Sequence, residues 1–313
     1  MSLAFVFPGQ GAQTIGMGRD LADAYPAARA VFEEVDAALG EKLSGLIWEG
    51  DQAELTLTRN AQPALMATSL AAMRALEAEG VKVTDAAFVA GHSLGEYSAL
   101  AAAGTFSVAD AARLLRLRGE AMQAAVPVGE GAMAAILGLD IAAVEALAEE
   151  AAMGEVCAAA NDNDPAQVVV SGNRDAVERA AALAKERGAK RALMLPVSAP
   201  FHCSLMAPAA AAMAEALAGV DMEDPVVPLV ANVLARPVGS ANAISSLLVE
   251  QVTRKVRWRE SVAWMAGEGG VTGFWEIGAG KALSGMIRRI ASEADTRVVG
   301  TAAEAAEAGA SRR

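Results

Sequence analysis

The sequence predicts an α/β fold with a mostly parallel sheet and a small second domain inserted into the larger one. Short apolar runs of strand length alternate with helix-forming runs along most of the chain, and this alternation is typical of a parallel sheet with helices on both faces. A glycine-flanked serine, Ser93, separates one such strand from a helix. Residues 128–197 instead show the order β-α-β-β-α-β, which is expected to form a separate small unit.

The part of the chain before this unit contains two predicted strands and four predicted helices. The first strand, Leu3–Phe7, is a continuous apolar run, as expected for a strand buried on both faces. The helices are assigned from apolar residues at helical spacing, with Gly104 ending one helix and Ser107 capping the next. The predicted elements are strands Leu3–Phe7 and Ala86–Ala90 and helices Asp20–Leu39, Gln62–Glu79, Glu96–Ala103 and Val108–Ala125.

The turn-rich stretch Pro127–Gly131 marks the start of the inserted domain, residues 128–197. Its strands and helices follow the order of ferredoxin-like domains. A turn is expected at Asn161–Pro165, which would place Asp162 and Asp164 on the far hairpin of the insert. The predicted elements are strands Ala132–Leu139, Val156–Ala160, Gln167–Ser171 and Lys190–Val197 and helices Ile141–Ala152 and Asp175–Arg187.

Residues 198–313 return to the alternating pattern and are expected to complete the larger domain together with residues 1–127. The segment Ala302–Arg313 is expected to be frayed. The other predicted elements are strands Val226–Val230, Gly273–Ile277 and Arg297–Gly300 and helices Ser204–Ala218, Ala241–Val256, Trp258–Ala266 and Lys281–Ile290.

Composition and charge narrow the class of protein. The two cysteines, Cys157 and Cys203, provide no disulfide framework and fit a reducing cytoplasm. No run of ~18 apolar residues is present, so no membrane span is expected. The net charge of −12 argues against nucleic acid as a partner. With two histidines in the chain, no zinc site of the His-Glu-x-x-His kind is expected, and the glycine-rich stretches lack the spacing of nucleotide-binding loops.

The stretch Gly91-His92-Ser93-Leu94-Gly95 predicts a nucleophile. It lies between a predicted strand and a predicted helix, the context in which Gly-x-Ser-x-Gly exposes a serine on a tight turn. Gly91 and Gly95 are expected where a side chain would block the packing of strand on helix. The backbone N–H of Leu94 would face a developing oxyanion. The alternative is an ordinary glycine-flanked turn.

A serine nucleophile needs a base, because its hydroxyl is protonated at neutral pH. His92 precedes Ser93, so its side chain is expected to point away from the serine and to pack behind the turn. His202, in the loop 198–202, is therefore the candidate base, although it could also be a structural interior histidine. No carboxylate stands out as a third member, and a carbonyl group could orient the imidazole instead.

Two further residues are candidates for binding. Arg118 falls inside the apolar stripe of the helix Val108–Ala125, and an inward-facing arginine is costly unless it meets an anion. We expect it to hold a substrate carboxylate, with a buried salt bridge or a snorkelling side chain as the alternatives. Gln10 follows the first strand, at the carboxyl edge where open α/β sheets bind ligands, and its N–H could be a second oxyanion donor.

These motifs together resemble the bacterial malonyl-CoA:acyl carrier protein transacylase family, from Leu3 to about Gly300. The family's fold is an α/β-hydrolase-like core with a ferredoxin-like insert. The motifs that carry the resemblance are Phe7-Pro8-Gly9-Gln10-Gly11, Gln62-Pro63-Ala64, Gly91-His92-Ser93-Leu94-Gly95-Glu96-Tyr97, Arg118-Gly119, Gly131-Ala132-Met133, Pro200-Phe201-His202 and Glu276-Ile277-Gly278-Ala279-Gly280.

The resemblance implies a role for each candidate residue. Ser93 would carry a malonyl ester, with His202 as its acid–base partner and Arg118 holding the free carboxylate. The main-chain carbonyl of Gln251 would orient the histidine, and the bulk of Phe201 would disfavour an α-methyl group. The N–H groups of Gln10 and Leu94 would form the oxyanion hole.

The implied activity is malonyl transfer from malonyl-CoA to the phosphopantetheine thiol of acyl carrier protein, in fatty acid or polyketide biosynthesis. No cofactor or metal is implied, since malonyl-CoA is a substrate. A serine esterase or thioesterase is the alternative enzymatic function. The other alternative is a non-catalytic binding protein, which would have the same fold but no need of a reactive serine. Carrier proteins are acidic, so docking is expected on basic residues, with Lys190, Arg191, Arg288 and Arg289 as candidates.

Overall fold

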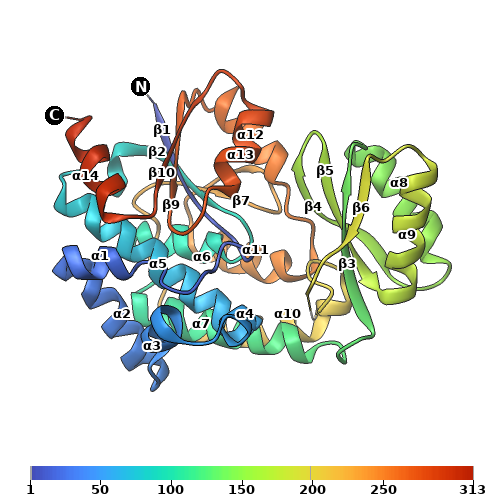
Figure 1. Ribbon diagram of the computed structural model, residues 1–313, viewed down its shortest axis with the longest axis horizontal. Helices are drawn as coiled ribbons and strands as arrows, with labels where there is room; N and C mark the ends of the chain where they lie inside the picture. Colours follow the sequence, from blue (N-terminus) through green and yellow to red (C-terminus); the bar gives the residue numbers. More distant parts are fainter. Residues whose placement is uncertain (1, 198, 313) are drawn as a thin grey trace.

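The larger sheet is organised around β1 (Leu3–Phe7), which lies at its centre. In the computed structural model, which describes residues 2–197 and 199–312, six strands lie in the order β10-β9-β1-β2-β7-β8 (Figure 1). All neighbouring strands are parallel except β7 and β8, which are antiparallel. The sheet is mixed but mostly parallel, which confirms the predicted α/β class. The other strands are β2 (Ala86–Gly91), β7 (Leu229–Ala231), β8 (Arg236–Val238), β9 (Gly273–Ile277) and β10 (Asp295–Val299).

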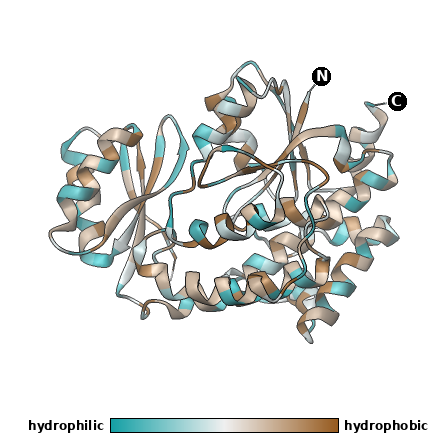
Figure 2. Ribbon diagram, turned by 180° about the vertical axis from the view of Figure 1, so that it is seen from behind, coloured by the Kyte–Doolittle hydropathy of each residue, from teal (hydrophilic) through white to brown (hydrophobic). Residues whose placement is uncertain are grey.

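Helices cover both faces of this sheet (Figure 1). Hydrophilic and hydrophobic residues alternate along the outer helices, as expected for helices with one buried face (Figure 2). The helices of this body are α1 (Arg19–Ala24), α2 (Pro26–Leu39), α3 (Leu43–Glu49), α4 (Gln52–Thr56), α5 (Thr58–Ala78), α6 (Gly95–Ala102), α7 (Val108–Ala124), α10 (Ala207–Ala218), α11 (Ala241–Thr253), α12 (Trp258–Ala266), α13 (Ala282–Ile290) and α14 (Ala302–Ala310).

β1 is apolar throughout because each face packs against a different layer. Phe5 belongs to the core that includes Leu65 of α5, whereas Val6 belongs to a second core that includes Val262 of α12. Successive side chains of a strand point to opposite faces, so a strand covered on both sides must be apolar at every position. The continuous run in the sequence is therefore explained by its central place.

The structure of the larger body differs from the prediction in three respects. The helix expected at Asp20–Leu39 is divided into α1 and α2, because Tyr25 precedes Pro26 and adopts an extended conformation with φ −124° and ψ 114°. The helices α3 and α4 and the strand β8 were not predicted. The segment expected to be frayed forms α14 as far as Ala310, capped by Thr301 and Glu304, and Arg313 lies outside the described residues.

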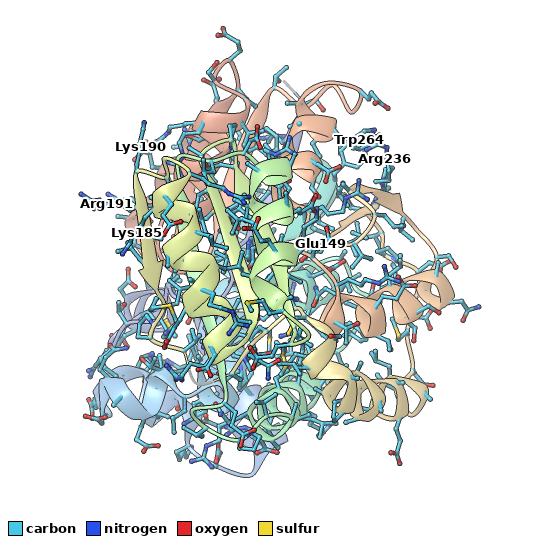
Figure 3. All side chains as sticks on the ribbon, turned by 90° about the vertical axis from the view of Figure 1, so that its right-hand side faces the viewer. Glu149, Lys185, Lys190, Arg191, Arg236 and Trp264 are labelled. Carbon is cyan, nitrogen blue, oxygen red and sulfur yellow. The ribbon has the colours of Figure 1, made fainter. Side chains whose placement is uncertain are left out.

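The second sheet is formed by a segment inserted between α7 and α10, and its strand order is β4-β5-β3-β6. All pairs of neighbouring strands in it are antiparallel. Two helices, α8 and α9, cover its outer face (Figures 1 and 3). The elements are β3 (Gly131–Leu137), α8 (Ile141–Ala152), β4 (Cys157–Asp164), β5 (Gln167–Asn173), α9 (Arg174–Glu186) and β6 (Arg191–Met194), in the predicted order. Ser198, at the predicted domain boundary, lies outside the described residues.

The turn predicted at Asn161–Pro165 lies instead at Pro165–Ala166, because residues as far as Asp164 belong to β4. The end of β4 lies against the larger body, whereas the prediction placed Asp162 and Asp164 on the far hairpin of the insert. The buried carboxylate of Asp162 pairs with Arg259 of α12 at 2.9 Å, and that of Asp164 pairs with Arg289 of α13 at 2.7 Å. The run of polar residues is typical of a turn, but two of its side chains, those of Asp162 and Asp164, form ion pairs with arginines of the larger body.

Candidate active site

The turn from β2 to α6 places Ser93 in a strained conformation. Its φ is 54°, a left-handed value that is uncommon for residues other than glycine. A Cβ added to Gly91 would lie 1.9 Å from the backbone of Gly95, and one added to Gly95 would lie 2.2 Å from the carbonyl oxygen of Phe7. The close packing predicted at both glycines is present. It brings the helix so near to the sheet that the serine side chain is turned outward.

Asn232 holds this turn from the end of β7. Its Oδ1 accepts a hydrogen bond from the N–H of Ser93 at 2.9 Å, and its Nδ2 donates to the carbonyl oxygen of Gly91 at 2.7 Å. The side chain thereby bridges the two backbone groups that flank His92 and fixes the strained residue. Asn232 was not predicted from the sequence. Its place directly after a short apolar strand was the signal that could have indicated it.

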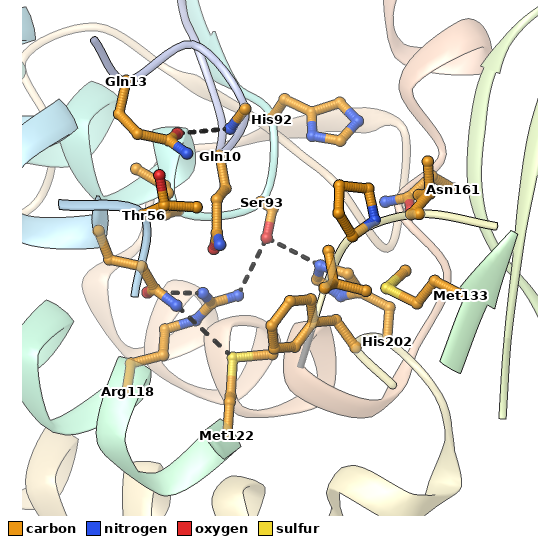
Figure 4. A pocket seen from close by; sticks show the side chains of 17 residues that line it. Gln10, Gln13, Thr56, His92, Ser93, Arg118, Met122, Met133, Asn161 and His202 are labelled. Atoms are coloured by element: carbon orange, nitrogen blue, oxygen red, sulfur yellow. Dashed lines mark hydrogen bonds between the residues drawn. The ribbon is translucent and has the colours of Figure 1, made fainter. Parts of the chain in front are cut away.

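Ser93 and His202 meet across 109 residues of sequence. The serine Oγ lies 2.8 Å from Nε2 of the imidazole, and Nδ1 of the same ring lies 2.8 Å from the carbonyl oxygen of Gln251 (Figure 4). When Nδ1–H donates to this carbonyl, Nε2 is left as the acceptor for the serine hydroxyl. The carbonyl contact implied for Gln251 is therefore present, and the described residues place no carboxylate on the ring.

The electrostatic environment keeps His202 neutral. Burial and, after it, the positive charge of Arg118 lower the pKa of His202 to about 3. Only 4 % of the residue is exposed. A neutral imidazole at neutral pH has the free Nε2 lone pair that a general base requires.

His92 points away from the serine, as expected (Figure 4). Its Nε2 lies 2.8 Å from Oδ1 of Asn163, and its ring contacts Trp258 edge to face at 5.8 Å between centroids. Burial lowers the pKa of His92, so it is a neutral packing residue at the contact with β4.

Arg118 faces inward, as the helical stripe predicted. Its guanidinium donates to Oε1 of Gln62 at 2.8 Å, to Oε1 of Gln251 at 2.8 Å and to Oγ of Ser93 at 3.2 Å. The residue is 1 % exposed, which excludes a side chain that snorkels to the surface. Among the described ion pairs none includes Arg118, so a buried salt bridge does not account for it either. A buried guanidinium held by neutral partners remains available to an anion.

A cavity of about 410 Å³ surrounds these groups and is lined by both units of the chain (Figure 4). Arg118 and His202 approach Ser93 from opposite sides of it. Gln10 and Leu94 lie in its wall, as does the ring of Phe201. The larger body contributes the reactive groups, and the insert contributes Met133, Asn161, Leu195, Pro196 and Val197.

The basic residues expected to dock a partner lie in two different settings. Lys190 and Arg191 are exposed at the start of β6, on one edge of the insert (Figure 3). Arg289 is engaged by Asp164, and the Nε of Arg288 donates to Thr296. Of the four candidates, Lys190 and Arg191 are therefore the two that no described side-chain contact holds in place.

The described part of the chain forms neither a metal-ion site nor a membrane-spanning helix. No group of three or more histidine, cysteine, aspartate or glutamate residues there could hold a metal ion. Nor does any described helix combine the length and the apolar character needed to cross a membrane.

Comparisons with known proteins extend along almost the whole chain. The pattern of the family described as acyl transferase domain matches residues 4–305. The malonyl CoA-acyl carrier protein transacylase of Bacillus subtilis is 50% identical over 289 residues, which are 92% of this chain and 90% of that protein. The protein of the same name from Escherichia coli is 50% identical over 287 residues, which are 92% of each chain.

Solved structures agree with the sequence relatives. The acyl-carrier-protein-S-malonyltransferase from Bartonella henselae is 56% identical, with a TM-score of 0.96 and 98% of each chain covered. A malonyl-transacylase solved in complex with its type II PKS acyl-carrier protein is 43% identical, with a TM-score of 0.96, and the match covers 99% of this chain and 100% of that one.

Proposed function

The chain belongs to the acyl transferase family, among relatives that are malonyl CoA-acyl carrier protein transacylases, and on this premise we propose that it transfers malonyl groups from malonyl-CoA to acyl carrier protein. The observation that carries the proposal is the placement of two groups around Ser93. His202 Nε2 lies 2.8 Å from the serine Oγ, and the guanidinium of Arg118 lies 3.2 Å from it. The nucleophile therefore lies close both to a general base and to a cation that can bind a carboxylate.

The first half of the reaction forms a seryl ester. Oγ of Ser93 attacks the thioester carbonyl carbon of malonyl-CoA while Nε2 of His202 takes the hydroxyl proton. The carbon–sulfur bond then breaks, and the CoA sulfur leaves with the proton from His202. The carbonyl oxygen carries negative charge in between, and we propose that the N–H groups of Gln10 and Leu94 stabilise it, since both residues line the cavity.

The second half reverses the roles. The phosphopantetheine thiol of the carrier protein gives its proton to His202, and its sulfur attacks the ester carbonyl. The bond between this carbon and Oγ breaks, and the serine oxygen takes the proton back. The carbonyl of Gln251 holds the imidazole in the same tautomer through both halves, because it accepts from Nδ1 at 2.8 Å. No cofactor or metal enters this scheme, since malonyl-CoA is a substrate.

Selection of the acyl group depends on two side chains in the proposed scheme. The free carboxylate of malonyl would bind the Arg118 guanidinium, which suits bidentate binding of carboxylates. The ring of Phe201 lies in the cavity wall next to the base, where its bulk would oppose an α-methyl group. A fixed acyl group also favours transfer over hydrolysis, because the thiol competes with water in a narrow cavity.

We further propose how the fold is divided. The larger body, residues 1–127 and 198–313, is the catalytic domain with an α/β-hydrolase-like core. Residues 128–197 form a ferredoxin-like insert, which is supported by the strand order β4-β5-β3-β6. The two unpaired cysteines are consistent with a cytoplasmic enzyme of fatty acid synthesis. Carrier docking is proposed near Lys190 and Arg191.

Product analysis tests the proposed function against hydrolysis. The purified protein is incubated with malonyl-CoA, with and without holo acyl carrier protein. We expect malonyl carrier protein to form when the carrier is present, and free malonate to form only slowly when it is absent. A serine thioesterase would release malonate at the same rate in both incubations, and that result would contradict the proposal. The Ser93→Ala variant is the control for uncatalysed exchange.

A further inference from the structure

Glu96 is a buried carboxyl group beside the proposed active site that no step above uses. It is the second residue of α6, three positions after Ser93, and 1 % of it is exposed. An acidic side chain is rarely buried to this extent unless it has partners. Its contacts therefore indicate what it does.

The carboxyl group accepts hydrogen bonds from two sides. The backbone N–H of Asn232 donates to Oε1 at 3.3 Å, and the side-chain Nε2 of Gln251 donates to Oε2 through a short hydrogen bond. The same Nε2 donates to the carbonyl oxygen of Ser93 at 3.0 Å. At the other end of the amide, Oε1 of Gln251 accepts from the guanidinium of Arg118 at 2.8 Å. One side chain thus joins Glu96 to Arg118.

The direction of the Gln251 amide matters to Arg118. An amide has nearly the same shape when it is turned over, but its oxygen and its NH2 group then exchange places. In the reversed direction the NH2 group would face the guanidinium, and two donors would meet. An ionised carboxylate accepts hydrogen bonds and donates none, so Glu96 favours the direction in which Oε1 faces Arg118.

Burial and the hydrogen-bond partners of Glu96 act in opposite directions on its ionisation, and both partners are N–H donors, which favour the ionised form. Burial raises the pKa of Glu96 to about 7, while the hydrogen bonds from Gln251 and Asn232 and the charge of Arg118 oppose this rise. The titratable neighbours Tyr97 and His202 are neutral at pH 7, since burial raises the pKa of Tyr97 to about 12 and lowers the pKa of His202 to about 3. Since no described ion pair includes Arg118, the carboxylate of Glu96 offsets the guanidinium charge through the intervening amide.

We propose that Glu96 is a positioning residue that acts through Gln251 to aim the Arg118 guanidinium at the carboxylate of the bound acyl group. It would therefore contribute to the preference for malonyl over uncharged acyl groups. The inference rests on the proposed malonyl transfer. It predicts an effect on acyl selection that a residue needed only for folding would not have.

Glu96→Gln tests this because it keeps the shape of the side chain and removes the charge. Its one carbonyl oxygen can serve either Asn232 or Gln251, and its NH2 group then faces the other donor. We expect kcat/KM for malonyl-CoA to fall roughly 10- to 100-fold, because hydrogen bonds to a buried charged group are lost. The value for acetyl-CoA should change much less. Glu96→Asp keeps an acceptor-only carboxylate, and its malonyl-to-acetyl ratio should lie between those of Glu96→Gln and the wild type.

Glu276→Gln is the matched control. Glu276 is also fully buried and also accepts two N–H groups, those of Leu283 at 3.0 Å and Ser284 at 2.7 Å, but unlike Glu96 it accepts none from Gln251. Its malonyl-to-acetyl ratio should stay at the wild-type value. Equal losses for both substrates in Glu96→Gln, or a ratio in Glu96→Asp no higher than in Glu96→Gln, would overturn the inference. A wild-type protein without malonyl transfer would instead refute the proposed function.

Discussion

Arg118 shows how much a single residue of this chain indicates about its ligand. Its guanidinium is buried, lies 5.7 Å from the centroid of the Tyr97 ring, and donates to the amide oxygens of Gln62 and Gln251. Burial of a full charge among neutral partners is costly, and burial lowers the pKa of the guanidinium. A bound carboxylate would lower this cost. The carboxylate of Glu96 reaches the guanidinium only through the Gln251 amide, so a carboxylate bound directly to Arg118 would lower this cost further.

Arg118→Ala is expected to change acyl selection. Malonyl transfer should fall by roughly 10- to 1000-fold in kcat/KM, since a charge-assisted bidentate contact is removed, while acetyl transfer should fall far less. Arg116→Ala is the control on the same helix, because its guanidinium contacts Asn60 and Glu41 outside the cavity. Steady-state rates with both acyl-CoA substrates measure the effect. The same loss for malonyl and acetyl would contradict a role for Arg118 in binding the carboxylate.

The residues of the candidate site differed in how well the sequence could predict them. Ser93 and Arg118 are indicated by local patterns, a turn motif and a helical stripe, and His202 follows because the chain has two histidines. Asn232 carries no such pattern, and Glu96 lies within the motif of Ser93 but has no role that the pattern itself indicates. Asn232 follows Ser93 by 139 residues, and their hydrogen bond exists only because β2 and β7 are neighbours in the sheet. The contacts of such polar residues can be identified only once the order of the strands in the sheet is known.

At the scale of elements, the turn between β2 and α6 depends on close approach of backbone. Asn232 and Gln251 hold it on one side, and the two glycines allow the helix to lie against the sheet. The strain at Ser93 persists because these neighbours fix it, as is common where a nucleophile is presented. Its position therefore depends on the packing of the whole element.

Gly91→Ala should destabilise the protein by about 3 kcal/mol or more, because its Cβ would lie 1.9 Å from the backbone of Gly95, which cannot move independently. Gly45→Ala in α3 is the matched control, since the nearest atom to its Cβ lies at an ordinary 3.8 Å. It should stabilise the protein by about 0.4–1 kcal/mol. Chemical denaturation of both variants measures these changes. A Gly91→Ala variant as stable as the wild type would refute the packing argument.

The bounds of helices and strands were predicted best where the spacing of apolar residues alone determines the element. Gly273–Ile277 and Ile141–Ala152 agree at both ends with the predicted ranges. The predictions failed where polar residues have tertiary partners, as in Asn161–Asp164, and where a capping box stabilises an alanine-rich end, as at Thr301. The contacts of Asp162 and Asp164 join residues distant in sequence, whereas the capping box of Thr301 and Glu304 is a local signal that the prediction missed.

At the scale of the whole molecule, the cavity depends on how the insert is attached. The end of β4 joins the larger body through backbone hydrogen bonds, Asp162 N–H to the carbonyl of Val256 at 2.9 Å and Val256 N–H to that of Ala160 at 2.8 Å. This attachment brings Asn161 into the wall of the cavity that Gln10 and Leu94 also line. The sequence indicated two units and their order, but the contact between them follows from side chains distant in sequence.

The central claim is that Ser93 carries the malonyl group between its donor, malonyl-CoA, and its acceptor, the carrier protein. It is tested most directly by the intact mass of the protein after brief incubation with malonyl-CoA and acid quenching, followed by peptide mapping. The wild type and the control Ser98→Ala, in which a buried serine of α6 is removed, should each gain one malonyl group on the peptide that contains Ser93, and Ser93→Ala should gain none. An unmodified wild type, or the same adduct on Ser93→Ala, would contradict the account.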